Sequence, residues 1–150
     1  MGVEKGDRWI LITGCSSGIG YACALGLHQR GYRVVASARR PEDVVRLSDE
    51  GLTAVRLDLD DPASIAECVD QALRLTGGSL YALFNNGAYG QPGAVEDLTR
   101  DCLRAQLETN LLGWHELTCH VIPVMRRQGG GRIVHNSSVL GLVALPFRGA

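Results

Sequence analysis

Short apolar runs alternate along the chain with longer segments of helical periodicity. The apolar runs predict five strands, at residues 9–13, 33–37, 53–57, 80–84 and 132–136. The segments between them predict helices at about 18–30 and 41–50, and a third that starts at Pro62 and stops at Gly77-Gly78. They also predict a long helical region from Thr99 to about Arg127 with a break near Asn110. Crossovers of this length join parallel strands. The pattern therefore predicts an α/β fold, a Rossmann-like doubly wound parallel sheet.

Residues that start and stop helices occur where this pattern needs them. Asp61 precedes Pro62, which places a capping carboxylate before a proline at the first helical position. Thr99 is a second capping residue, and Gly31 and Gly51 follow predicted helix ends, where a left-handed residue is favoured. No linker or internal repeat interrupts the pattern, so we expect residues 1–150 to form one domain.

Composition narrows the class of protein. Hydrophobic residues make up 45% of the 150 residues and charged residues 21%, as in soluble globular proteins. The net charge of −1 gives no electrostatic reason to expect a nucleic acid or an anionic membrane as a partner. A local cluster of basic residues suffices for one small anion, so a small-molecule partner stays open.

The apolar runs and the cysteines indicate where in the cell the protein is located. No run approaches the roughly 20 residues needed to span a bilayer, and the polar start, residues 1–7, lacks a signal-peptide core. The cysteines are scattered, with no C-x-x-C pair, so neither a metal site nor a disulfide framework is expected. We expect free thiols in the cytoplasm. They are Cys15, Cys23, Cys68, Cys102 and Cys119.

A glycine-rich turn between the first strand and the first helix is the strongest motif. Residues 13–20 read TGCSSGIG, with glycines spaced G-x-x-x-G-x-G. Such a turn lets the backbone approach a pyrophosphate, and the helix N-terminus behind it offers free N–H groups to the phosphates. The candidate cofactor-binding residues of this turn are Gly14, Ser16, Ser17, Gly18, Ile19 and Gly20.

The turn resembles the T-G-x-x-x-G-x-G signature of short-chain dehydrogenases/reductases, and three further segments match that family in order and spacing. Residues 85–88, NNGA, stand where the family has N-N-A-G, with Gly and Ala exchanged. Residues 109–113 hold a helix asparagine, Asn110, and residues 132–141 resemble the strand that delivers the catalytic serine. The resemblance covers essentially all 150 residues.

The end of the second strand predicts the cofactor. Residues 37–40, SARR, carry no carboxylate, although an acidic residue near Ala38 would mark an NAD enzyme of this family. Arg39 stands where NADP-using members bind the 2′-phosphate, which a planar guanidinium suits. We therefore expect NADP rather than NAD. The resemblance adds further cofactor-binding candidates: Asp58, Leu59, Asn85, Asn86 and Gly87.

The resemblance also implies the chemistry, which is hydride transfer between a nicotinamide and a carbonyl or alcohol. In the family a serine positions the substrate oxygen, a tyrosine acts as acid or base, a lysine lowers the pKa of that tyrosine, and an asparagine holds a proton-relay water. Ser138 is our candidate serine, with Ser137 as the alternative, and Asn110 is our candidate asparagine.

The family's Tyr-x-x-x-Lys pair does not occur in the 150 residues. Family spacing from Ser138 places the tyrosine immediately after Ala150. We therefore expect the chain to be the front part of a longer enzyme, with the C-terminal part of its domain missing. On this hypothesis the 150-residue piece alone is inactive, and strand 132–136 becomes an unpaired sheet edge.

Two other classes of function remain open beside the NADP-dependent oxidoreductase. A nucleotide-binding module without catalysis, such as a redox sensor, fits the missing Tyr and Lys. A Rossmann-like epimerase or dehydratase would use the same turn, although the context of Ser138 and the Asn85-Asn86 turn argue against it. Relatives that pair through the helices after the fourth strand suggest a homo-oligomer of the whole enzyme.

Overall fold

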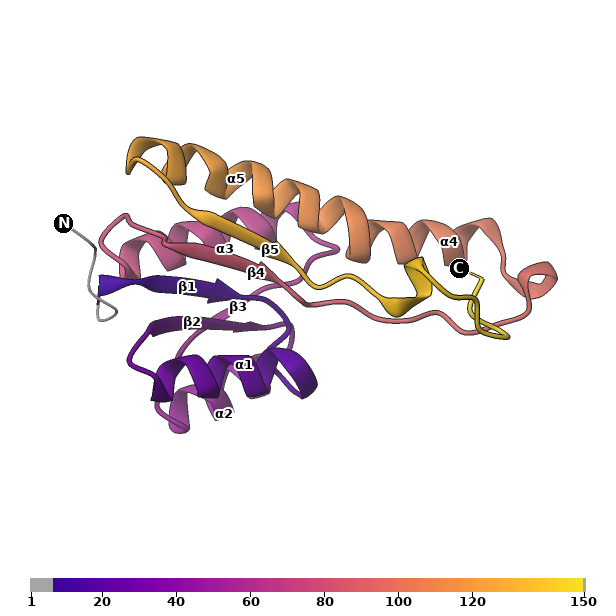
Figure 1. The fold of residues 1–150 in the computed structure, drawn as a ribbon, viewed down its shortest axis with the longest axis horizontal. Coiled ribbons are helices and arrows are strands. Elements are labelled where there is room, and N and C mark those ends of the chain that lie inside the picture. The colour runs from indigo at the N-terminus through magenta and orange to yellow at the C-terminus, as the bar shows by residue number, and fades with distance from the viewer. Residues whose placement is uncertain (1–6, 150) are drawn as a thin grey trace.

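The structure, a computed structural model, describes residues 7–149, so residues 1–6 of the polar start and Ala150 lie outside the described residues. Its centre is a sheet of parallel strands in the order β3-β2-β1-β4-β5 (Figure 1). This order confirms the predicted doubly wound Rossmann-like sheet. The strands are β1 (Trp9–Ile12), β2 (Arg33–Ala38), β3 (Thr53–Arg56), β4 (Ala82–Asn85) and β5 (Arg132–His135).

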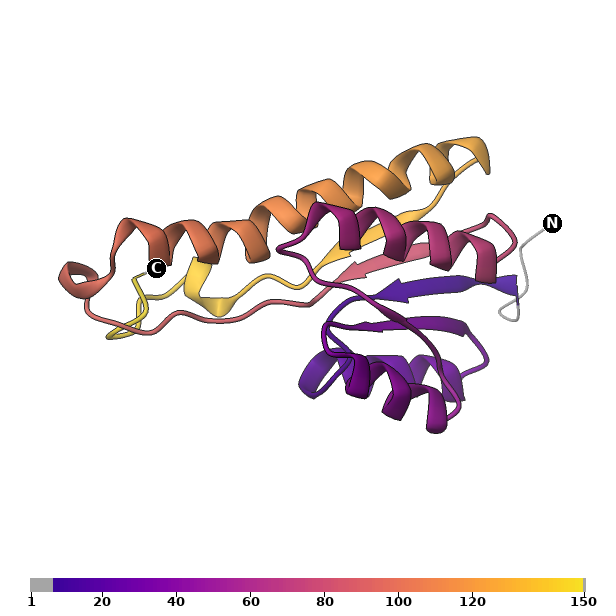
Figure 2. The same cartoon turned by 180° about the vertical axis from the view of Figure 1, so that it is seen from behind.

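Helices cover both faces of the sheet. Helices α1 (Gly18–Gln29) and α2 (Pro41–Asp49) lie on one face, and α3 (Pro62–Leu75) and α5 (Gly113–Arg127) lie on the other (Figures 1 and 2). Because side chains alternate along a strand, β1 contributes to two apolar cores. Leu11 packs on the α3–α5 side, and Ile10 and Ile12 pack on the α1–α2 side. Burial on both faces explains why the strands are continuous apolar runs.

The predicted helix ends are confirmed. The side chain of Asp61 accepts a hydrogen bond from the backbone N–H of Ala63 at 3.0 Å. That of Thr99 accepts one from the backbone N–H of Cys102 at 3.3 Å. Gly31 and Gly51 have φ angles of 85° and 86°, the left-handed conformation that glycine adopts without a steric penalty.

The long helical region has the predicted break at Asn110. Helix α4 (Arg100–Leu107) passes into a π-helical turn at Glu108–Leu112, which continues into α5. A single π turn inserted between α-helices is frequently found at functional sites. Two short 3₁₀ turns complete the described chain, η2 (Val95–Asp97) and η4 (Val139–Gly141).

All five predicted strands are found, with ends that differ from the prediction by one or two residues. We expected the fourth strand at residues 80–84, whereas β4 begins at Ala82 and ends at Asn85. The structure includes Asn85 in β4, where it pairs with His135 of β5. Parallel pairing with a neighbouring strand, which local propensity cannot reveal, extends the strand by this residue.

The segments that follow β4 and β5 extend beyond the carboxyl ends of the strands. Residues 86–99, α4 and residues 138–149 form this extension (Figures 1 and 2). Within it, the backbone N–H of Gly93 donates to the carbonyl of Phe147 at 3.0 Å. β5 is an edge strand that pairs with β4 alone among the described strands, and Val134 is 52% exposed. Within residues 7–149, no helix combines the length and apolarity required to cross a bilayer.

Candidate functional site

The glycines of the turn at residues 13–20 allow close packing between backbone segments. Gly14 has a φ of 68°, and a Cβ on it would lie 2.5 Å from the Cα of Gly87. A Cβ on Gly20 would overlap the carbonyl oxygen of Gly14 and lie 2.5 Å from the side-chain nitrogen of Asn86. Gly18 has a φ of 61° with open space beside it. Two of the three glycines therefore serve contacts within the protein, and the third lies at the open start of α1.

Thr13 joins the end of β1 to the segment after β4. Its fully buried hydroxyl accepts hydrogen bonds from the backbone N–H groups of Asn86 at 2.8 Å and Gly87 at 2.7 Å. The side-chain amide of Asn86 donates in return to the carbonyl of Thr13 at 3.0 Å. In the sequence, Thr13 is marked only as the first residue of the TGCSSGIG motif. The structure shows that it anchors the two strand ends to each other.

Two residues that sequence reasoning missed complete this anchor. The side-chain amide of Asn136, just after β5, donates to the side-chain oxygen of Asn86 at 2.9 Å. The indole of Trp114 on α5 donates to the carbonyl of Gly87 at 2.7 Å and stacks on His135 with ring centroids 5.8 Å apart. Asn136 lies inside a recognised motif, whereas nothing in the sequence pattern marks Trp114.

Arg46 of α2 holds the glycine-rich turn through a hydrogen bond to its backbone. Its guanidinium donates to the carbonyl of Ser16 at 2.7 Å and to the carboxylate of Glu50 at 3.1 Å. Asp43 lies 3.5 Å from Arg46 and 2.9 Å from Arg40. The hydrogen bond from Arg40 is the main reason that the pKa of Asp43 is lowered. This ion-pair network ties α2 to the glycine-rich turn.

The cysteine in the turn is a buried structural residue. The thiol of Cys15 donates to the carbonyl of Ile12 at 3.2 Å. Burial raises the pKa of Cys15 to about 12, so the thiol stays protonated at neutral pH. Cys68 is buried in the α3–α5 core, and its pKa is likewise raised to about 12 by burial. These two thiols serve packing rather than chemistry.

A first cavity, here called the nucleotide cleft, lies at the carboxyl ends of β1, β2 and β3. Its volume is about 180 Å³. Six predicted cofactor-binding residues line it together: Gly14, Ser16, Arg39, Asp58, Leu59 and Gly87. Ligands in open α/β sheets bind at this edge. Two larger hollows, around Trp9 and around Gln128, lie at the amino ends of the strands and contain none of the predicted residues.

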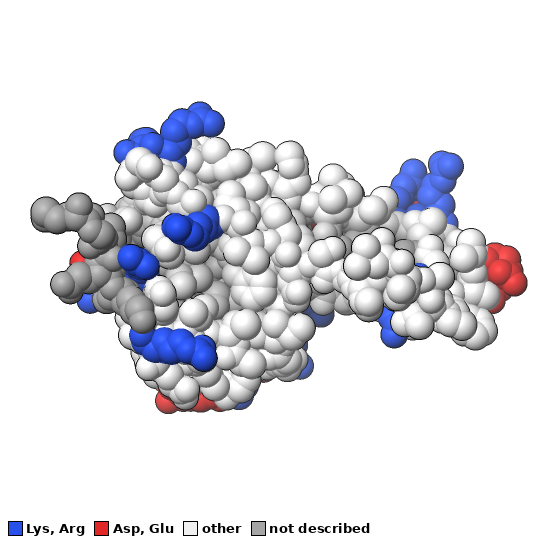
Figure 3. All heavy atoms as spheres, in the orientation of Figure 1, with Lys and Arg blue, Asp and Glu red and all other residues white. Residues whose placement is uncertain are grey.

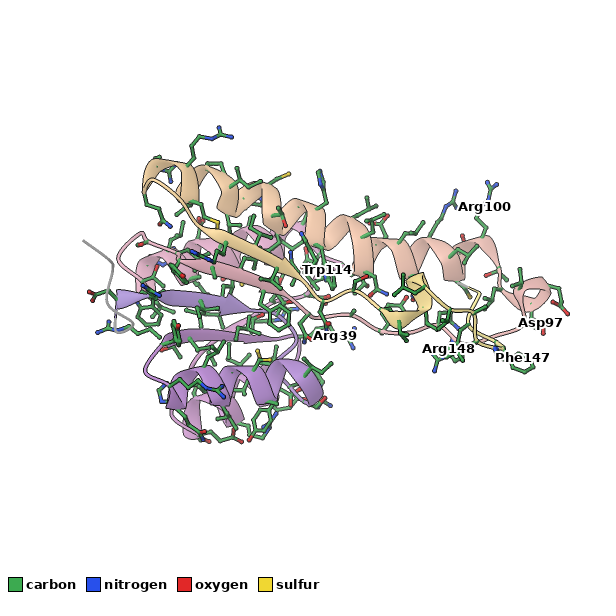
Figure 4. All side chains as sticks on the ribbon, viewed as in Figure 1. Arg39, Asp97, Arg100, Trp114, Phe147 and Arg148 are labelled. Carbon is green, nitrogen blue, oxygen red and sulfur yellow. The ribbon has the colours of Figure 1, made fainter. Side chains whose placement is uncertain are left out.

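The two neighbouring arginines after β2, Arg39 and Arg40, differ in whether their guanidiniums have carboxylate partners. The guanidinium of Arg40 bonds to Asp43 at 2.9 Å and lies 3.5 Å from Glu42. Arg39 is exposed, lines the nucleotide cleft, and makes no hydrogen bond or ion pair with any described residue. Figure 4 shows Arg39 at the carboxyl end of the sheet. Only one of the two guanidiniums is therefore available to an anion in the cleft.

The remaining cofactor candidates lie outside the lining of the nucleotide cleft. Ser17, Gly18 and Ile19 are exposed at the start of α1, where Ile19 is 60% exposed. Asn85 is fully buried, and its side-chain amide donates to Thr118 at 3.1 Å on the α5 side. The structure therefore brings the exposed turn residues to the open helix start, and it places Asn85 in the interior.

A second cavity, here called the distal cavity, lies between the extension and the end of β5. Its volume is about 580 Å³, and Asn86, Asn110, Ser137 and Ser138 all line it. Ala88 and Tyr89 line both cavities, so the nucleotide cleft and the distal cavity share a wall. The candidate asparagine and serine, which come from a helix and a strand end far apart in the sequence, meet in one space.

The two catalytic candidates, Asn110 and Ser138, differ in how far their polar atoms are already engaged in hydrogen bonds. The side chain of Asn110 accepts from the backbone N–H of Tyr89 at 3.1 Å and donates to its carbonyl at 2.7 Å, which fixes the loop after β4. The hydroxyl of Ser138 accepts from the backbone N–H of Leu140 at 3.1 Å. An accepting hydroxyl still has its own hydrogen to donate, so Ser138 can donate to an oxygen in the distal cavity.

Comparison with known proteins identifies relatives of this chain. Residues 8–150 match the short chain dehydrogenase family. The chain is 44% identical over 144 residues to the uncharacterized oxidoreductase YbbO of Escherichia coli K12, covering 96% of this chain and 54% of that protein. It is 32% identical over 147 residues to the NADPH-dependent 1-acyldihydroxyacetone phosphate reductase of Schizosaccharomyces pombe, covering 97% and 49%.

A solved structure agrees with the sequence matches. A short-chain dehydrogenase from Streptomyces avermitilis superposes with a TM-score of 0.86 at 32% identity, over 93% of this chain and 52% of that one. The chain thus spans about half the length of the curated relatives it matches. The fold, the glycine-rich turn and the family match over residues 8–150 lead to one conclusion: this chain belongs to the short-chain dehydrogenase family of oxidoreductases.

Proposed function

We propose that the whole protein is an NADP-dependent oxidoreductase that transfers hydride between the nicotinamide and a carbonyl compound or secondary alcohol. The observation that carries this proposal is the shared wall between the two cavities. Six predicted cofactor-binding residues line the nucleotide cleft, and Asn110 and Ser138 line the distal cavity beyond Ala88 and Tyr89. A cofactor held along both cavities would bring its reactive end beside the candidate catalytic residues.

Arg39 supports NADP as the cofactor. Its guanidinium is uncommitted among the described residues and lines the same cleft as Asp58, whereas Arg40 is engaged by Asp43. A 2′-phosphate on the adenosine ribose would give Arg39 a bidentate partner. One relative of this chain is named as NADPH-dependent, which favours the same choice.

In the proposed reaction the bound nicotinamide supplies or accepts the hydride. Ser138 donates its hydroxyl hydrogen to the substrate oxygen and so orients the carbonyl. Asn110 holds the loop at Tyr89 that separates the two cavities and lies where the family's proton-relay asparagine is expected. The resemblance assigns acid–base transfer to the Tyr-Lys pair expected beyond Ala150. The cytoplasm remains the proposed location, in keeping with five cysteines that form no disulfide.

Activity of the whole protein tests the proposal. NADPH oxidation is measured with a panel of ketones and aldehydes, in the parent and in Ser138→Ala and Ser137→Ala. We expect Ser138→Ala to lower kcat/KM by about 10²–10³, the order found when one oxyanion-stabilising donor is removed. Ser137→Ala is the matched control and should keep most activity, and neither change should alter the Kd for NADPH.

Two results would contradict this function in distinct ways. Tight NADPH binding without turnover of any carbonyl compound would favour the nucleotide-binding module without catalysis. Product formation with no net oxidation or reduction of the cofactor would favour an epimerase or dehydratase.

Cofactor choice is tested separately by Arg39→Gln with Arg40→Gln as the control. Loss of a charged hydrogen-bond partner should weaken NADPH binding by roughly 10- to 100-fold. NADH binding should be unchanged, because NADH lacks the 2′-phosphate. Arg40→Gln should leave the ratio of the two Kd values unchanged. An equal loss for both cofactors in Arg39→Gln would contradict the assignment.

A further inference from the structure

One charged side chain lines the distal cavity among the described residues, and it is basic. Arg148 stands in the C-terminal segment, which runs beside the loop after β4. Its guanidinium lies close to Gly90, where a Cβ would be only 2.8 Å from the terminal nitrogen. The other lining side chains are neutral. They include the carboxamides of Gln91 and Gln106, the asparagines named above, and the two serines.

The charge of Arg148 is not compensated within the described residues. Its side chain forms no ion pair or hydrogen bond with any of them, although other arginines of the chain have carboxylate partners. The acidic residues of the neighbouring turn η2, Glu96 and Asp97, form no ion pair with Arg148. No carboxylate lines the cavity, so an anion that enters it meets one attractive charge and no repulsive one.

A second lining residue also lacks a partner. The side-chain oxygen of Gln106 on α4 is shielded from solvent and accepts no hydrogen bond from any described residue. A shielded acceptor without a donor costs free energy that a ligand hydroxyl or N–H would recover. The distal cavity therefore offers a cation and a free acceptor, both suited to a polar ligand.

We propose that the substrate carries an anionic group, a carboxylate or a phosphate ester, which Arg148 binds while Ser138 donates to the reacting oxygen. Arg148 is thus a specificity-determining residue for the reaction. A guanidinium recognises either anion through two parallel N–H···O bonds. The inference rests on the proposed oxidoreductase function and adds the substrate class to it.

Binding to the whole protein loaded with NADP⁺ tests this directly, with two matched pairs of small ketones as probes. The first pair is levulinate and its neutral amide. The second is dihydroxyacetone phosphate and dihydroxyacetone, so that the two pairs distinguish a carboxylate from a phosphate ester. Trp114 lines the distal cavity, so its fluorescence provides a binding signal that does not depend on turnover. The variants are Arg148→Gln and Arg148→Lys.

Arg100→Gln is the matched control. Arg100 is an exposed arginine on α4 that does not line either cavity, and Figure 4 shows it on the outer side of that helix. In the parent we expect the anion of at least one pair to bind roughly tenfold more tightly than its neutral partner, as for a partly solvated charged hydrogen bond. Arg148→Gln should abolish this ratio without weakening the neutral ketone, Arg148→Lys should restore part of it, and Arg100→Gln should preserve it.

Three results would overturn the inference: equal Kd values within both pairs, no saturable binding of either anion, or the same loss of the ratio in Arg100→Gln. NADPH oxidation with the same probes separates the inference from the proposed function. Equal turnover of anionic and neutral ketones would retain the oxidoreductase and reject the anion site. Preferential anion binding with no turnover of any carbonyl compound would retain the site and reject the oxidoreductase.

Discussion

The two cavities share a wall but differ in how tightly the segments around them are packed. Around the nucleotide cleft, backbone segments contact each other directly at Gly14 and Gly87, and the buried hydroxyl of Thr13 holds two backbone N–H groups. Around the distal cavity, the extension is largely solvent-exposed, with Leu142 at 88% and Phe147 at 67%. The packing around the nucleotide cleft therefore tolerates little change, whereas the exposed side chains of the extension can vary without disturbing a packed core. This difference agrees with the proposal that the cofactor lies in the nucleotide cleft and the substrate in the distal cavity.

Charge also differs between the two cavities, because the lining of the nucleotide cleft contains both Arg39 and Asp58. In the face shown in Figure 3, arginines lie near the amino ends of the strands and over α4 at the opposite end, and the middle of the face carries few charges. The distal cavity has a single basic residue in its lining among the described residues. One substitution there would change the charge of the cavity, while the packing at Gly14 and Gly20 would stay as it is.

Adding one methyl group to the glycine-rich turn should have the largest effect. In Gly20→Ala the new Cβ overlaps the carbonyl of Gly14 and approaches the side chain of Asn86, both of which are held by other contacts. We expect a loss of about 3 kcal/mol or more in the free energy of unfolding, together with loss of measurable NADPH binding. Denaturant unfolding and NADPH titration measure the two effects.

Gly26→Ala in the same helix is the matched control. Its Cβ would meet only the flexible end of Arg30, at 3.4 Å. Because alanine is the better helix former, this variant should be neutral or more stable by up to about 1 kcal/mol. Equal destabilisation by the two alanines would show that the turn is not tightly packed at Gly20.

Removing the hydroxyl of Thr13 should have the next largest effect. Thr13→Val keeps the shape but leaves the N–H groups of Asn86 and Gly87 buried without an acceptor. Each buried unsatisfied group costs about 1–3 kcal/mol, so we expect a loss of about 2 kcal/mol or more. Thr13→Ser retains the acceptor and should lose only about 1 kcal/mol for the missing methyl group. A smaller loss in the valine variant than in the serine variant would contradict the anchoring role.

Sequence reasoning worked where a residue's role depends on its chain neighbours. Continuous apolar runs and helical periodicity predicted the strands and helices, Asp61 and Thr99 cap the predicted helices, and the predicted break at Asn110 is a π turn. Six cofactor candidates met in one cleft because parallel strands end at one edge. Roles that depend on contacts between distant segments could not be predicted from the sequence. No pattern among neighbouring residues indicates that the indole of Trp114 bonds to Gly87 or that Asn85 is buried.

On the exposed side of the shared wall we expect a smaller and more local effect. In Asn110→Ala the loop at Tyr89 loses two hydrogen bonds, from a site that solvent reaches. The free energy of unfolding should fall by about 1 kcal/mol. Hydrogen exchange should accelerate at the Tyr89 amide while the amides of Asn86 and Gly87 stay protected. Loss of protection at all three amides would show that the two cavities are mechanically coupled rather than separately constructed.

The smallest effect on stability is expected at Asp43, in the ion-pair network of α2. Asp43→Asn removes the carboxylate that bonds Arg40, but Arg46 keeps both Glu50 and the carbonyl of Ser16, so the turn keeps its support. Because Arg40 lowers the pKa of Asp43 in the folded chain, the unfolded chain takes up a proton first as the pH falls below the ordinary value of 3.8. The stabilising contribution of Asp43 is therefore present at neutral pH and lost in acid.

The stability difference between the parent and Asp43→Asn should be small near neutral pH and should shrink further below pH 3.8. Denaturant unfolding across this range measures it, with the exposed Asp70→Asn as the control that should show no such trend. A difference that grows in acid would mean that Asp43 titrates above its ordinary value, and that the ion pairs do not govern its charge.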